Sequence, residues 1–174
     1  MKLSLTEDQG LIQSSALDWL SGQYDFRQRE AGLHRDGGSP ETWRAFAEMG
    51  WLGLPLPEEV GGLGMGLLEA GLLMQTLGRH LVVEPVHATV LQAARLVALA
   101  GTPAQQAEWL PPLVAGELRL ALAHMEPDDR GPWGARRAMA RRSPEGWRID
   151  GEKRQAIAAP GASQIGRASC RERV

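Results

Sequence analysis

The sequence GELRLALAHM, residues 116–125, indicates the fold class, because the spacing of apolar residues changes within it. Leu118, Leu120 and Leu122 stand at every second position, and the residues between them beyond Arg119 are also apolar. Alternation with a period of two predicts a β-strand. A strand that is apolar on nearly both faces must be covered on both sides.

The residues before this strand have apolar positions at helical spacing. Thr6 and Thr102 each begin a capping box, and Ser39 followed by Pro40 is a further helix start. Pro111 and Pro112 are expected to kink or end the helix that contains them. The predicted helices cover residues 6–22, 39–50, 66–79, 84–101 and 102–113.

The residues after the strand predict further strands rather than helices. Ala135–Arg142, Trp147–Asp150 and Arg154–Ala159 are expected to be extended, and Ser143–Gly146 forms a turn with proline at its second position. Helices followed by strands predict an α+β protein. The expected architecture is an amino-terminal all-α helical domain followed by the start of an antiparallel β domain.

We expect the helical domain to cover residues 1–117 and a partial middle β domain to cover residues 118–164. The charge changes near this boundary: residues 1–118 carry 7 basic and 14 acidic side chains, and residues 119–164 carry 9 and 6. The tail IGRASCRERV, residues 165–174, has no period and contains the single cysteine. The codons of a common sequencing adapter encode these residues in order, so we interpret the tail as translated adapter and the natural part as a fragment.

Composition excludes several classes of protein. The chain has 174 residues, 43% of them apolar, and a formal net charge of -2, which is ordinary for a folded domain. One cysteine excludes a disulfide scaffold, and a pI of about 6.1 argues against nucleic-acid binding. No apolar run is long enough to span a membrane, and the start MKLSLTEDQG is not a secretory signal, so we expect a cytoplasmic protein.

Three kinds of chemical motif are incomplete in this sequence. The glycine-rich run at residues 61–66 lacks the third glycine and the preceding strand of a dinucleotide fingerprint, so it is interpreted as a turn between helices. The four histidines lack metal-ligand spacing, so no metal site is expected. No Ser-His-Asp set can be assembled.

Four sequence blocks together resemble the acyl-CoA dehydrogenase family, from about residue 3 to residue 163. WLGLPLPEEVGGLG, residues 51–64, resembles that family's PEExGGxG loop. The other blocks follow in the family's order and lie at residues 77–79, 101–118 and 146–153. The segments Tyr24–Arg27 and Ala123–Glu126 are most similar to the branch called pimeloyl-CoA dehydrogenase small subunit.

The resemblance implies an oxidoreductase of fatty acid metabolism that uses FAD to oxidise the α,β carbon–carbon bond of an acyl-CoA thioester. It also implies a homo- or hetero-oligomer with another dehydrogenase subunit. In the family a carboxylate in the carboxy-terminal helices removes the α-proton, and the 174 residues do not include those helices. No catalytic residue is therefore assigned, and we expect the chain to be inactive as given.

The resemblance also implies which residues lie against the flavin. The backbone amides of Leu122, His124, Met125 and Ile157 are the expected cofactor contacts, since backbone donors survive substitution. Two of these positions depart from the family, because Met125 and Ile157 stand where the family has threonine hydroxyls. Residues 130–132, Arg-Gly-Pro, replace the family's Gly-Ser-Asp.

These departures leave two alternatives open. The first is a non-catalytic partner subunit of a heteromeric acyl-CoA dehydrogenase, whose helical domain packs on an active subunit. The second is a helical interaction module unrelated to acyl-CoA.

Overall fold

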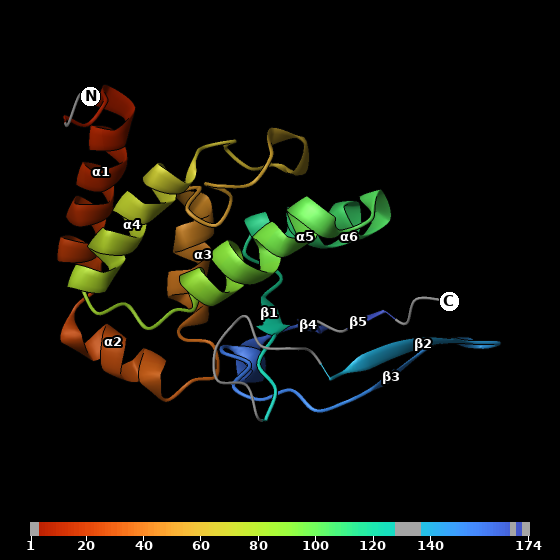
Figure 1. Cartoon of the computed structure of the whole chain (residues 1–174). Helices are drawn as coiled ribbons and strands as arrows, with labels where there is room; N and C mark the ends of the chain where they lie inside the picture. Colours follow the sequence, from red (N-terminus) through yellow and green to blue (C-terminus); the bar gives the residue numbers. More distant parts are fainter. Residues whose placement is uncertain (1–3, 128–136, 168–169, 172–174) are drawn as a thin grey trace.

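The computed structural model describes residues 4–127, 137–167 and 170–171. Figure 1 shows helices in the amino-terminal part and strands in the carboxy-terminal part. The elements in chain order are α1 (Glu7–Gln23), α2 (Phe26–Leu33), α3 (Pro40–Glu48), the 3-10 turn η1 (Glu58–Val60), α4 (Leu67–Arg79), the π-helix η2 (His87–Ala94), α5 (Arg95–Ala100), α6 (Pro103–Val114), β1 (Leu120–Ala123), β2 (Met139–Ser143), β3 (Gly146–Asp150), the 3-10 turn η3 (Ala159–Gly161), β4 (Gln164–Arg167) and β5 (Cys170–Arg171). The predicted α+β fold class is confirmed.

Three of the predicted helix starts, at Thr6, Ser39 and Thr102, are confirmed by their side-chain caps. The Thr6 and Thr102 hydroxyls accept from the amides of Gln9 and Gln105, and both glutamine side chains accept from the cap amides in return. The same capping box at Asp25 starts α2, a helix that the apolar pattern did not predict. This short helix buries only Gly32, so it has no apolar stripe.

Of the two effects expected for the prolines in α6, a kink or an end, the structure excludes the end. The helix continues to Val114, with Pro111 and Pro112 inside it. Leu110 and Leu113 flank the prolines, and both are fully buried. Burial of these two side chains offsets the amide hydrogen bonds that the prolines cannot donate.

Two apolar clusters hold the helices together. One is centred on aromatic rings, with Phe46 and Trp51 4.8 Å apart and Trp19 edge-on to both. The other joins α6 to the first strand, because Leu110, Leu113 and Leu120 belong to one buried group. The helical part and β1 therefore share a core.

Strand β1 is covered on both sides, as its sequence predicts. Leu120, Ala121 and Ala123 are all less than 5% exposed. Its strand partner is β4, which runs parallel to it, with Ala121 opposite Ile165. The interpretation of residues 165–174 as translated adapter stays a prediction, since backbone bonds form a ladder whatever the side chains are.

The second sheet has the order β3-β2-β5, and its β2–β3 pair is the predicted antiparallel hairpin. The expected strand over Ala135–Arg142 begins only at Met139, and residues 135 and 136 lie outside the described part. The predicted strand Arg154–Ala159 is wrong. Only Arg154 pairs, with Met125, and positive φ angles of 52° at Gln155 and 66° at Ala158 turn the chain into η3.

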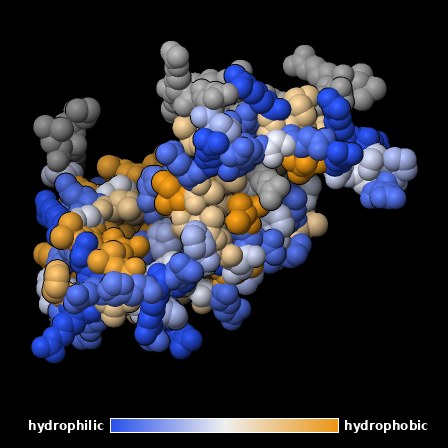
Figure 2. All heavy atoms as spheres, turned by 90° about the horizontal axis from the view of Figure 1, so that it is seen from below, coloured by the Kyte–Doolittle hydropathy of each residue, from blue (hydrophilic) through white to orange (hydrophobic). Residues whose placement is uncertain are grey.

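The face in Figure 2 carries apolar side chains over the end of the molecule that holds α1, α2 and α4. Phe26 and Leu33 on α2 are 71% and 54% exposed, and Leu81 is 64% exposed. Arg29 donates from Nε to the Leu81 carbonyl at 3.0 Å and links α2 to the segment after α4.

The glycine-rich segment at residues 61–66 is a tight turn between helices, as expected. The amides of Gly64 and Met65 donate to the carbonyls of Leu56 and Leu54 at 2.8 and 3.0 Å. A Cβ at Gly62 would lie 2.2 Å from the Leu56 carbonyl oxygen. Only glycine leaves room for this close approach of two backbones.

Substitution of Gly62 tests this packing. We expect Gly62→Ala to lower the free energy of unfolding by about 1–3 kcal/mol, because the added methyl group meets fixed backbone. The matched control is Gly71→Ala in α4, where a Cβ meets nothing within 4 Å. It should raise stability by up to about 1 kcal/mol. Urea denaturation of both variants provides the measurement, and a G62A chain as stable as the unsubstituted one contradicts the prediction.

Candidate functional site

The candidate site lies where β1 ends, because three of the four residues expected to contact the flavin are there. Leu122 is within β1, and His124 and Met125 follow it; all three are half-buried. The amide of Arg154 donates to the Met125 carbonyl at 2.9 Å and forms an isolated antiparallel bridge. This bridge brings the segment after Gly151 to the end of β1.

Ile157, the fourth expected contact, lies three residues beyond the bridge in the turn that replaces the predicted strand. Its side chain is 63% exposed. Ile157 therefore follows the bridged segment, but it lies on a turn and not on an extended partner of β1.

A buried ion pair that the sequence analysis did not predict fixes the end of β1. Lys153 Nζ donates to Glu126 Oε1 at 2.6 Å, and the two side chains are only 7% and 5% exposed. The same ammonium group reaches the His124 carbonyl at 3.4 Å. Glu126 also accepts from the amides of Arg137 and Ala138 at 2.7 and 3.1 Å.

These donors lower the pKa of Glu126 from its ordinary value of 4.5 to about 2. The hydrogen bond from Lys153 is the largest cause, followed by the bond from the Arg137 amide. Glu126 is therefore ionised at neutral pH, and it holds together three segments: the end of β1, the start of β2 and residue 153. Lys153 and Glu126 are 27 residues apart in the sequence, so no local pattern predicts their contact. The only sequence signal that included Lys153 was the GEK segment after β3.

A second buried carboxylate, Glu84, links the segment after α1 to the start of α3. Its Oε2 accepts from the Tyr24 hydroxyl at 2.9 Å and its Oε1 accepts from the Ser39 amide at 3.0 Å. Burial raises the pKa of Tyr24 to about 12, and the charge of Glu84 adds to the effect. Tyr24 is therefore a neutral hydrogen-bond donor, with its own oxygen accepting from the Val83 amide at 3.1 Å.

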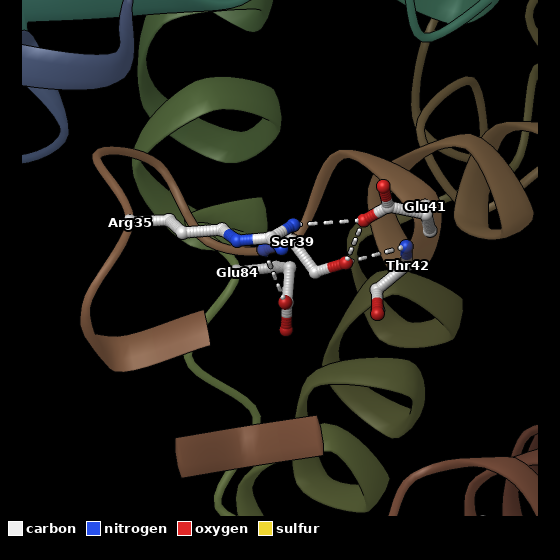
Figure 3. A network of polar contacts seen from close by, with 5 residues as sticks. All are labelled: Arg35, Ser39, Glu41, Thr42 and Glu84. Atoms are coloured by element: carbon white, nitrogen blue, oxygen red, sulfur yellow. Dashed lines mark hydrogen bonds and ion pairs between the residues drawn. The ribbon is translucent and has the colours of Figure 1, made fainter. Parts of the chain in front are cut away.

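Figure 3 shows how this carboxylate meets the start of α3. Ser39 donates its hydroxyl to Glu41 at 2.7 Å while accepting from the Thr42 amide, and Arg35 pairs with the same Glu41 oxygen at 3.0 Å. A hollow of about 360 Å³ adjoins this network between α1, α2 and α3. The Ser39 hydroxyl caps α3. Arg35 and Glu41 are exposed and pair with each other, so this ion pair offers no unpaired group for catalysis.

Other classes of site find no support in the described part of the chain. Residues 4–127, 137–167 and 170–171 contain no group of three side chains that could hold a metal ion. Among those same residues, no helix is long and apolar enough to cross a membrane. Residues 130–132, which replace the family's Gly-Ser-Asp, lie outside the described residues.

Comparison with known proteins identifies the class to which this fold belongs. The amino-terminal domain of acyl-CoA dehydrogenases, as a family model, matches residues 6–117. The chain therefore belongs to the acyl-CoA dehydrogenase family. This match covers the helices that enclose β1, and the recognition made from the sequence blocks is confirmed.

Individual relatives are similar over most of this chain but are much longer. FadE12, an acyl-CoA dehydrogenase of Mycobacterium tuberculosis, is 29% identical over 152 residues, which are 85% of this chain and 38% of the relative. The (2S)-methylsuccinyl-CoA dehydrogenase of Cereibacter sphaeroides is 34% identical over 114 residues, 65% of this chain and 21% of that protein. The chain thus spans well under half the length of these relatives.

Solved structures show the same arrangement of helices and strands. A variant of the Tcur3481-Tcur3483 steroid ACAD matches with a TM-score of 0.84 at 28% identity, over 95% of this chain and 45% of that one. An acyl-CoA dehydrogenase complexed with FAD from Bacillus anthracis matches with a TM-score of 0.73 at 25% identity, over 86% and 26%. An FAD complex of PigA, at 22% identity and a TM-score of 0.85, shows likeness of fold alone.

The low pKa of Glu126 predicts an acid-sensitive contribution to stability. The ionised carboxylate stabilises the folded chain above pH 4.5, and this contribution is lost as the pH falls toward about 2. The stability difference between the unsubstituted chain and Glu126→Gln should therefore shrink over that interval, as measured by urea denaturation at each pH. Glu152→Gln is the control, because Glu152 pairs with Arg154 while 62% exposed. A difference for E126Q that stays constant from pH 4.5 to 2 contradicts the prediction.

Proposed function

We propose that the full-length protein is an FAD-dependent acyl-CoA dehydrogenase, in which this chain supplies the helical domain and one wall of the flavin site. Family membership supports the activity, and the Bacillus anthracis relative is a complex with FAD. The observation that carries the proposal is the covered strand β1, whose end is held by the bridge to Arg154 and by Lys153. A rigid strand end is the kind of element that can position a cofactor.

The four expected contact residues are proposed to line one face of the flavin ring system. Leu122 and Met125 are half-buried apolar side chains, and Ile157 presents an exposed apolar surface. The expected polar contacts are backbone amides of these residues and of His124, since no side-chain hydroxyl is present at 125 or 157. When bound, FAD would accept the hydride from the acyl chain.

The chain's own residues would contribute position and exclusion of water. The helices that cover β1 provide a dry wall, since Leu110, Leu113 and Leu120 are at most 3% exposed. The proton-abstracting carboxylate is proposed to belong to the part of the full-length protein beyond these 174 residues. The substrate class proposed is an acyl-CoA thioester of fatty acid metabolism, and the proposed location is the cytoplasm.

A non-catalytic subunit is the second candidate, and one observation favours it. Met125 and Ile157 cannot donate a hydroxyl hydrogen bond, so this site would bind flavin less tightly than one with two threonines. The Tcur3481-Tcur3483 steroid ACAD, 28% identical, has two components in its name. We propose assembly with a second dehydrogenase subunit, identical or different. The exposed apolar side chains at Phe26, Leu33 and Leu81 are compatible with such contacts.

Purification of the full-length gene product tests the proposal. We expect it to carry a yellow chromophore that absorbs at about 450 nm, as flavin cofactors do. This band should disappear when an acyl-CoA substrate is added without an electron acceptor. The 174-residue chain is the control and should bind no FAD, because it provides one wall only. A colourless full-length protein that takes up no added FAD contradicts the proposed FAD-dependent dehydrogenase. A flavin band that acyl-CoA does not bleach favours the non-catalytic subunit.

A further inference from the structure

The Lys153–Glu126 pair does more than join segments, because its ammonium group lies beside the carbonyl oxygen of one peptide group. Lys153 Nζ lies 3.4 Å from the His124 carbonyl oxygen and 2.6 Å from Glu126 Oε1. The His124 carbonyl belongs to the same peptide unit as the amide N–H of Met125. A cation at the carbonyl end of a peptide unit polarises it and makes its N–H a stronger donor.

The burial of the pair strengthens this polarisation of the peptide group. Both side chains are at most 7% exposed, so solvent screens the two charges weakly. The carboxylate of Glu126 is fixed by the Arg137 and Ala138 amides, so it cannot swing away from the ammonium group. The ammonium group is thereby held at the end of β1.

We propose that Lys153 and Glu126 are positioning residues for the flavin, which fix the His124–Met125 peptide group and balance the charge behind it. This inference rests on the proposed function for its effect on the cofactor. Its structural half, the fixing of the β1 end, concerns this chain alone.

The charge balance predicts opposite effects for the two partners in the full-length flavoprotein. A positive charge near a flavin favours its reduction, and a negative charge opposes it. Glu126→Gln leaves the ammonium group unbalanced and should raise the flavin reduction potential. Lys153→Met removes the positive charge and should lower it. A pair that served only for stability would shift the potential in the same direction in both variants, or not at all.

Conservative and matched variants complete this experiment. Lys153→Arg retains the charge, and its potential should lie closer to that of the unsubstituted protein than that of K153M. Arg148→Met is the control for loss of a cation, because Arg148 pairs with Asp150 while 76% exposed, and it should leave the potential unchanged. If K153M does not fold, E126Q alone gives the direction of the shift, and an unchanged or lowered potential in E126Q then overturns the proposal. Shifts of equal sign in E126Q and K153M overturn the proposal.

Hydrogen exchange in the 174-residue chain tests the structural half without any flavin. The amides of Ala138 and Arg154 should exchange at least about tenfold faster in both E126Q and K153M, since breaking a buried pair loosens the groups around it. R148M should not change them. If the full-length protein binds no flavin, the proposed function and the effect on potential both fail, while faster exchange still supports the structural half. Unchanged exchange in E126Q and K153M overturns that half whatever the full-length protein binds.

Discussion

The structure depends on the burial of β1 among helices. Leu120 belongs to the same apolar cluster as Leu110 and Leu113 of α6, and η2 packs against the strand. Ala121 and Ala123 are small enough to let other elements approach, and both are less than 5% exposed. A buried strand must satisfy its backbone groups, and β4 pairs with one edge of β1 in parallel register. The helical part and the strand part are consequently one packed unit at this point, although their sequences follow different periods.

Arg119 and Glu84 make the same connection with polar groups. The Arg119 guanidinium lies 4.8 Å from the centre of the Trp43 ring in α3. The backbone carbonyl of Arg119 accepts from the Ser163 amide at 2.8 Å. One residue thus links α3 to the chain just before β1 and just before β4. Glu84 interacts electrostatically with Arg119, and its side chain requires glycine at residue 38, because a Cβ at Gly38 would lie 2.9 Å from it. Gly38 also has a φ of +81°, which glycine adopts without strain.

Local signals in the sequence were sufficient for most helices and for β1, whereas contacts distant in sequence were not. Capping boxes at Thr6 and Thr102 involve residues three apart, so their geometry follows from the sequence. The parallel partner of β1 and the Lys153–Glu126 pair depend on folding of the whole chain. The prediction of a strand over residues 154–159 was wrong for another reason. Gln155 and Ala158 adopt positive φ angles, which their residue types do not indicate. At the candidate site, the position of β1 was predictable, and the groups that fix its end were not.

The two buried carboxylates differ in the donors that stabilise them, and the difference follows their places in the fold. Glu84 is bonded by a hydroxyl and an amide, both uncharged, with Tyr24 held neutral by burial. Glu126 is bonded by an ammonium group and two amides, which makes its ionised form strongly favoured. Apolar residues of similar volume could have joined the same segments with equal or greater stability. A buried ion pair instead places a fixed dipole at the end of β1. The ion pair orients the strand end, because the Lys153 ammonium group donates to both Glu126 and the His124 carbonyl and so restricts the arrangement of these two groups.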